Sequence, residues 1–188
     1  VSAPPSDEFS DLLFISSLYT RAARGKDAIE AANRALGIAT GSERRQIAKT
    51  ALATAMQMSG DTAGAEKTLR EVLRETSGNP MALNNLGYFL AERGESLEEA
   101  VEMIKAALKV DPRNPSYLDS LGWAYFRMGR IAEAERYLMD AARIDADSAT
   151  IYAHLGDLYN AKNDRARARS LWERALRLAT EAAEIERI

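Results

Sequence analysis

The sequence predicts an all-α protein built from about five stacked helix pairs. A Leu-Gly dipeptide recurs with its glycine at Gly87, Gly122 and Gly156, at intervals of 35 and 34 residues. A fixed period in this range is typical of proteins that stack identical units of secondary structure. Apolar residues also recur at helical spacing from near residue 7 almost to the end, with no strand-like alternation. These observations together favour a helical repeat array over any fold that contains a sheet.

Composition and charge exclude several classes of protein. The chain has 188 residues, of which 46% are hydrophobic and 28% charged, as in folded rather than disordered proteins. The net charge of −3 lacks the basic excess of nucleic-acid binders, so we expect no nucleic-acid partner. The chain contains no cysteine, which excludes disulfides and thiolate sites. No apolar run approaches the roughly 18 residues of a membrane span.

The second helix of each pair shows a shared register of small residues. Each of these helices has an alanine near its start and a second small or β-branched residue seven positions later. Such residues let two helices approach closely. The two sets are Ala28, Ala65, Ala100, Ala134 and Ala168, and Ala35, Val72, Ala107, Ala141 and Ala175.

The turn inside each pair is also marked by residue type. Glycine and asparagine tolerate the left-handed backbone conformation that commonly ends a helix. They occur where the first helix of each pair is expected to stop, at Gly25, Gly60, Gly94, Gly129 and Asn163.

Several first helices carry start signals. Asn79-Pro80 and Asn114-Pro115 each place a capping side chain before a proline at the first helical position. Ser148 is expected to cap the first helix of the fifth pair. Ser96 and Glu99 predict a capping box at the second helix of the third pair.

These signals define the expected organisation of the chain. Pro4 and Pro5 predict a flexible leader. An apolar stripe after Thr180 predicts a helical extension that covers the end of the stack. The predicted spans are a leader at 1–6, a repeat region at 7–180 with pairs at about 7–41, 42–78, 79–113, 114–147 and 148–180, and a capping extension at 181–188.

The repeat pattern resembles the tetratricopeptide repeat, in which a Leu-Gly pair and an aromatic residue are followed by alanines at fixed distances. The fourth pair carries Leu118, Leu121, Gly122, Tyr125, Ala134, Leu138 and Ala141. The fifth carries Tyr152, Leu155, Gly156, Tyr159, Ala168, Trp172 and Ala175. The third is a comparable match, the second is weaker, and the first keeps only its second helix. The resemblance implies a right-handed α-solenoid that binds proteins.

The amino-acid sequence within the repeats resembles that of a narrower group of proteins. The runs NNLGYFLAER, LDSLGWAYFRMGR and AHLGDLY are similar to the last repeats of large bacterial tetratricopeptide proteins. Several such proteins are envelope lipoproteins that act as adaptors, for example for carboxyl-terminal processing proteases. The resemblance therefore implies a bacterial adaptor. Its compartment is either the periplasm or envelope, as part of a longer lipoprotein, or the cytoplasm.

In this family the first helices line a concave groove, and the residues expected to face it form the candidate binding site. Asparagines offer donors and acceptors to a peptide backbone, and aromatic rings supply rigid contact area. Aspartates favour a basic residue or a chain amine on the ligand. The candidate residues are Asn84, Asn85, Tyr88, Asp119, Trp123, Phe126, His154, Asp157 and Asn160.

Other interpretations of these residues stay open. Tyr88 and Trp123 also fit a core position against the next repeat, and Asn84 and Asn85 fit hydration of the groove or bonds across repeats. Family members that bind chaperone tails use lysine, asparagine and arginine as a carboxylate clamp. The lysines and arginine are missing from the aligned positions here, so we do not expect recognition of a C-terminal carboxylate.

Catalysis is not expected. His154 is the only histidine, so every Ser-His arrangement would need it, and the absence of cysteine excludes a Cys-His arrangement. No nucleotide-binding or metal-binding motif is present, so no cofactor and no metal are expected. The predicted function is a non-catalytic scaffold that holds a peptide or segment of a partner protein. The alternative is a structural protein that self-assembles into a homo-oligomer through the ends of the stack.

Overall fold

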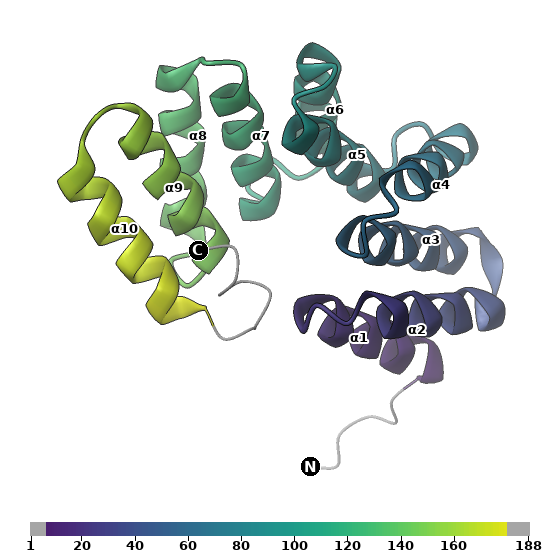
Figure 1. Ribbon diagram of the computed structural model, residues 1–188. Helices are drawn as coiled ribbons and strands as arrows, with labels where there is room; N and C mark the ends of the chain where they lie inside the picture. Colours follow the sequence, from purple (N-terminus) through teal and green to yellow (C-terminus); the bar gives the residue numbers. More distant parts are fainter. Residues whose placement is uncertain (1–6, 180–188) are drawn as a thin grey trace, which may run out of the picture. The chain divides into compact units, whose positions relative to one another are not determined.

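The computed structural model describes residues 7–179, and this part of the chain is helical throughout (Figure 1). It contains ten α-helices and no strand, as the sequence predicts. They are α1 (Glu8–Arg21), α2 (Gly25–Ile38), α3 (Gly41–Met58), α4 (Thr62–Glu75), α5 (Pro80–Arg93), α6 (Leu97–Val110), α7 (Pro115–Arg127), α8 (Ile131–Ile144), α9 (Ala149–Ala161) and α10 (Arg165–Leu178). The predicted leader at 1–6 and the extension at 181–188 lie outside the described residues. The chain divides into two compact units, Val1–Ser77 and Gly78–Ile188.

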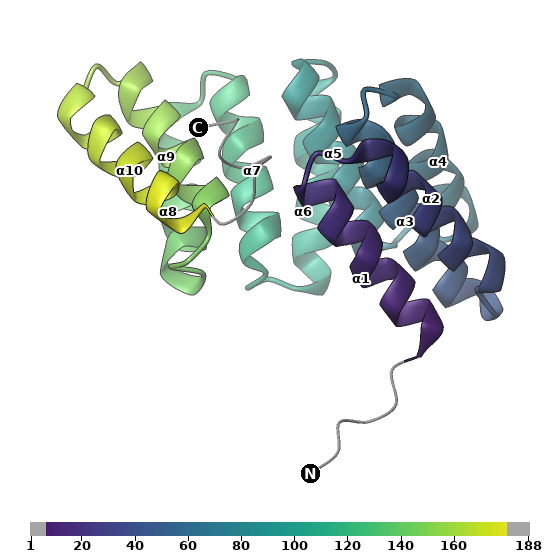
Figure 2. The ribbon, with the colours of Figure 1, turned by 60° about the horizontal axis from the view of Figure 1, so that its bottom comes forward.

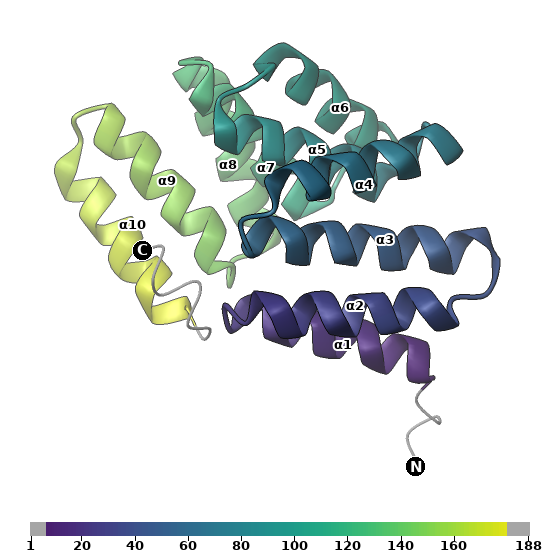
Figure 3. The same cartoon turned by 45° about the vertical axis from the view of Figure 1, so that its right-hand side comes forward.

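The first unit contains α1 to α4. Helix α2 packs against both α1 and α3, and α3 also packs against α1 and α4 (Figure 3). Its apolar core gathers Phe9 and Leu12 of α1 with Ala35 of α2 and Ala48 of α3. This unit is therefore built from two helix hairpins whose first helices touch.

The second unit contains α5 to α10 and has two layers. Helices α5, α7 and α9 contact one another in sequence and form one layer, which we call the inner layer. Helices α6, α8 and α10 each pack on their own hairpin partner (Figure 2), and we call these three helices the outer layer. The inner layer carries most of the predicted groove residues, so this unit holds the candidate site.

The predicted register of small residues is confirmed in the described helices. All of the aligned positions in the second helices are fully buried, from Ala28 and Ala35 in α2 to Ala168 and Ala175 in α10. Large side chains between them, such as Leu138, are fully buried as well. The helices of each pair can approach closely because the contact is made by residues with little side-chain volume.

The turn prediction is correct for four pairs and wrong for the first. Gly60, Gly94, Gly129 and Asn163 have positive φ angles of 88°, 70°, 74° and 61°. In the first pair Ala23 takes the left-handed position, with φ of 53°, and Gly25 begins α2. Gly25 serves another purpose, since a Cβ there would lie 2.6 Å from Cβ of Ser59 at the end of α3.

The start signals of the inner layer are confirmed. The side-chain oxygen of Asn79 accepts from the amide of Ala82 at 3.0 Å, and that of Asn114 accepts from Ser116 and Tyr117. Ser148 caps α9.

The capping box at α6 is wrong. Ser96 adopts a left-handed conformation with φ of 44°, and its side chain makes no capping hydrogen bond. Three residues separate α5 from α6, as in the other pairs, but two of them follow the left-handed Gly94 where the neighbouring pairs have one. Ser96 accommodates this extra residue with its own left-handed backbone.

The close approach inside each pair predicts a strong penalty for enlarging Gly87. A Cβ at this position would lie 2.7 Å from Cγ1 of Ile104 and 2.9 Å from the carbonyl oxygen of Ala100. Because overpacking forces backbone shifts, Gly87→Ala should lower the free energy of unfolding by about 2 kcal/mol in urea titrations followed by circular dichroism. Gly37 in α2 has no neighbour within 4 Å, so Gly37→Ala should be neutral or slightly stabilising. Equal losses in the two variants would contradict this account.

Candidate functional site

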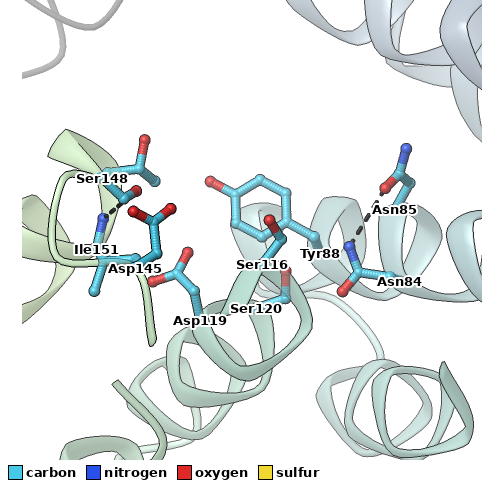
Figure 4. Close-up of a pocket in the computed structure, with 10 residues that line it drawn as sticks. Asn84, Asn85, Tyr88, Ser116, Asp119, Ser120, Asp145, Ser148 and Ile151 are labelled. Atoms are coloured by element: carbon cyan, nitrogen blue, oxygen red, sulfur yellow. Dashed lines mark hydrogen bonds between the residues drawn. The ribbon is translucent and has the colours of Figure 1, made fainter. Parts of the chain in front are cut away.

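The inner layer of the second unit surrounds a hollow of about 280 Å³ (Figure 4). Its floor comes from α5 and α7, and one side comes from the turn between α8 and α9. The lining residues are Asn84, Asn85, Tyr88, Ser116, Asp119, Ser120, Asp145, Ser148, Thr150 and Ile151. Four of the nine candidate residues from the sequence, Asn84, Asn85, Tyr88 and Asp119, therefore share one cavity.

Asp119 and His154 form a buried pair between α7 and α9. Nδ1 of His154 lies 2.8 Å from Oδ1 of Asp119, and the two residues are 0% and 6% exposed. The sequence places His154 on the groove surface, whereas in the structure it lies beneath it. His154 is the sixth residue of α9, and it points at α7 because these two helices pack against each other. The pair ties these two helices together under the hollow.

Trp123 is also buried and belongs to a stack of rings. Its indole lies 4.2 Å from the His154 ring and 5.1 Å from the Phe126 ring, both in stacked geometry. It is 9% exposed, which matches the core interpretation rather than the groove interpretation. Tyr88 of α5 is half-buried, and its ring centroid lies 6.4 Å from that of His154 in a tilted arrangement. The rings thus link all three helices of the inner layer.

The remaining candidate residues lie away from the hollow. Asp157 accepts a hydrogen bond from Nε1 of Trp172 at 3.1 Å, so it connects α9 to α10. Asn160 is exposed near the end of α9, and Phe126 is half-buried against Trp123. These three residues therefore do not line the hollow.

Two of the candidate residues on this layer each have a buried polar atom without a hydrogen-bond partner. One atom is Oδ1 of Asn84, a residue that lines the hollow, and the other is Nε1 of Trp123. The amide nitrogen of Asn84 donates to Oδ1 of Asn85 at 3.4 Å. A buried polar atom without a partner lowers stability by roughly 1–3 kcal/mol. Such atoms are typical of sites completed by another molecule.

Asp145 lines the hollow but was not predicted from the sequence. This residue is the C-cap of α8 and follows the helix, so the spacing of helical faces does not reach it. Its closeness to the predicted N-cap Ser148 is the one sequence signal that could have identified it. The turn that holds both residues leads into α9, a helix of the inner layer. Ser148 was predicted as a cap and also lines the hollow.

Glu135 fastens α8 to α9 outside the hollow. Its carboxylate accepts from Nζ of Lys162 at 2.7 Å and from the hydroxyl of Tyr159. The hydrogen bond with Lys162, followed by that with Tyr159, lowers the pKa of Glu135. A lowered carboxyl pKa stabilises the folded state at neutral pH, and this contribution is lost as the pH falls through the lowered value.

Neither metal sites nor membrane helices are found in the part of the chain that the structure describes. No group of three or more histidine or acidic side chains there could hold a metal ion. Within residues 7–179, no helix has the length and apolar character needed to span a bilayer.

Models of a known protein family match most of the chain. Models of the tetratricopeptide repeat match residues 50–115, 95–150 and 148–185, which together exceed half of the chain. The chain belongs to the tetratricopeptide repeat family. Such repeats mediate protein–protein interactions, and the fold is typically a non-catalytic scaffold.

Curated relatives match parts of the chain. A TPR repeat-containing protein of Pseudomonas aeruginosa is 46% identical over 97 residues, which are 52% of this chain and 16% of that protein. The photosystem I assembly protein Ycf3 of a Synechococcus strain is 32% identical over 98 residues, 47% of this chain and 56% of that protein. The human protein O-mannosyl-transferase TMTC1 is 24% identical over 89% of this chain and 19% of its own length. The matched part of the chain thus spans less than a fifth of the Pseudomonas and human proteins and about half of Ycf3.

Solved structures share the fold. A TPR protein of Thermus thermophilus superposes with a TM-score of 0.78 and 21% identity, covering 95% of both chains. PilF of Pseudomonas aeruginosa gives a TM-score of 0.66 and 22% identity, covering 95% of this chain and 79% of that one. These similarities place the helix pairs of both units among known tetratricopeptide folds.

The buried pair predicts a larger loss of stability at Asp119 than at surface aspartates. Asp119→Ala removes the carboxylate that pairs with Nδ1 of His154. The imidazole is then buried without this partner, so the free energy of unfolding should fall by about 2 kcal/mol. Asp140 pairs with Arg143 on the exposed face of α8, and Asp140→Ala should change stability by less than about 0.5 kcal/mol. Urea unfolding of both variants checks this, and a loss at Asp140 as large as that at Asp119 would refute it.

Proposed function

We propose that this chain is a non-catalytic scaffold whose second unit holds an extended segment of a partner protein in the hollow of its inner layer. The carrying observation is the cavity itself, which joins Asn84, Asn85, Tyr88 and Asp119 from two adjacent helices. The inner layer of this family is where a stack presents an extended concave surface. One curated relative is named as an assembly protein, which agrees with a scaffolding role.

The lining chemistry suits a peptide. Side-chain amides of asparagine both donate and accept hydrogen bonds, as the backbone of an extended chain does. Tyr88 presents an aromatic surface that is half-exposed, with few rotatable bonds to immobilise on binding. The hollow contains no lysine or arginine, which argues against a carboxylate clamp.

An enzymatic role has little support. The single histidine, His154, is 0% exposed and bound to Asp119, so a substrate in solvent does not reach it. The chain has no cysteine nucleophile. A mechanism that uses histidine or cysteine as general base or nucleophile needs that group within hydrogen-bond reach of the substrate.

The proposal predicts that peptides bind through Tyr88. Linear peptides would be selected from a random display library against the full chain, and their affinities measured by calorimetry. Tyr88→Ala should weaken binding at least about tenfold, because a central aromatic contact is lost. Tyr137 is matched in type and partial burial but lies on α8 in the outer layer, so Tyr137→Ala should leave affinity unchanged. Peptides that lose affinity equally in both variants, or in neither, would oppose the proposal.

One observation favours a second candidate function, self-association. On α1 the side chains of Phe14, Ile15 and Leu18 are 62%, 39% and 39% exposed. They lie within one helical turn and form an apolar surface on the first helix. Clustered apolar side chains at a surface are typical of interfaces between chains.

Self-association through α1 predicts a mass that rises with protein concentration in analytical ultracentrifugation. Phe14→Glu should abolish that rise, because it places a charge in the apolar surface. Val110 in α6 is as exposed as Phe14, at 63%, so the same change to glutamate at Val110 serves as the control and should leave the rise in mass intact. A constant monomer mass for the unaltered chain would exclude this second function.

A further inference from the structure

The hollow of the second unit is rich in hydrogen-bond acceptors. Asn84 of α5, Asp119 of α7 and Asp145 at the end of α8 supply side-chain oxygens to it from three separate elements (Figure 4). None of the lining residues is a lysine or an arginine. The lining therefore carries negative charge without any positive charge of its own.

Asn84 shows that this cavity lacks a donor. The residue is 6% exposed, and its Oδ1 is buried with no hydrogen-bond partner. Its amide nitrogen already donates to Asn85, so the group that completes Asn84 must bring a hydrogen to the oxygen. In Figure 4 this oxygen points from α5 toward Ser120 on α7, into the hollow. Because burial makes an unpaired acceptor unfavourable, a ligand that donates here recovers that free energy.

The two carboxylates are available to the same ligand. Asp119 binds His154 through Oδ1, and its other oxygen has no partner among residues 7–179. Asp145 accepts only the backbone amide of Asp147, at 3.2 Å, and has no cationic partner in the described part of the chain. Hydrogen bonds from a cation to a carboxylate are about twice as strong as those between neutral groups.

The Tyr88 ring adds a third kind of contact. It stands in the hollow between the asparagines of α5 and the carboxylates of Asp119 and Asp145 (Figure 4). The face of a tyrosine ring attracts cations, with a strength that rises as water is excluded. Acceptor oxygens on both sides of an aromatic face form a setting suited to a positively charged nitrogen group.

We infer that the hollow binds a cationic nitrogen group of a partner segment, the ammonium of a lysine or the guanidinium of an arginine. Asn84, Asp119 and Asp145 accept its N–H donors, and Tyr88 contacts it through the ring. This inference rests on the proposed function, since it names the chemistry of the segment that the scaffold holds. Both side chains share the positive charge and the multiple donors that the site requires, and they differ in donor geometry.

The test uses random linear peptides displayed on phage and selected against the full chain. Selected sequences should share a lysine or arginine at one aligned position. Synthetic versions of a selected peptide then replace that residue with arginine, lysine, citrulline or acetyl-lysine, and calorimetry measures each affinity. Citrulline keeps nearly the shape of arginine and acetyl-lysine keeps the aliphatic chain of lysine, but both lack the charge, so they should bind at least about tenfold more weakly. The arginine and lysine versions decide which cation the site prefers.

Asp145→Asn is the matching change in the protein, because it keeps the side-chain shape and removes the charge. It should reduce the preference for the charged peptide about tenfold and reduce the salt dependence of binding. Asp111 is the equivalent C-cap residue of α6 and does not line the hollow, so Asp111→Asn serves as the control and should change neither property. Circular dichroism verifies that both variants fold.

The outcomes separate this inference from the proposed function. Peptides that need Tyr88 but share no basic residue, or that tolerate Asp145→Asn, would overturn the cation site and leave the scaffold role standing. A selection that yields no peptide dependent on Tyr88 would overturn both. Both would be supported if the selected peptides share a basic residue and its contribution to affinity disappears in Asp145→Asn but not in Asp111→Asn.

Discussion

The architecture depends on helices that meet through residues with almost no side chain. Ala100, Ala134 and Ala168 are fully buried, and in α5 Gly87 faces Ile104 with no room for a methyl group. Such contacts fix the distance between the helices of a pair, so every pair offers its neighbour a similar surface. The inner layer follows from this constraint. Polar residues on α5 and α7 are brought together by the stacking of their pairs, and the turn between α8 and α9 adds Asp145 and Ser148.

The inner layer divides its polar residues between two tasks. Asp119 and His154 bond to each other beneath the surface, with Trp123 stacked on the imidazole, and they hold α7 to α9. Asn84 and Tyr88 line the cavity above them. A rigid support under a polar surface is the arrangement by which a binding site is kept in its bound geometry before the ligand arrives.

The sequence predicted what a repeat determines and missed what neighbouring repeats determine together. The buried alanines and the caps at Asn79 and Asn114 follow from local rules, and the structure agrees with them. His154 was assigned to the groove, and Trp123 either to the groove or to the core, because helical spacing gives a direction from the helix axis but not the position of the next helix. Asp145 was missed since it lies in a turn, where no period applies. The extra residue in the α6 turn similarly changed the role of Ser96.

The unpaired oxygen of Asn84 has a consequence for evolution as well as for binding. A leucine at this position would fill the space without burying an unmatched acceptor, and the free chain would be more stable. Retaining the asparagine keeps the empty scaffold less stable than its sequence could make it. Under the proposed binding of a cationic group, part of the stabilisation of this unit would be gained only when the complex forms. The isolated protein and its complex should accordingly differ most in rigidity around α5, at the part of the second unit nearest to the missing donor.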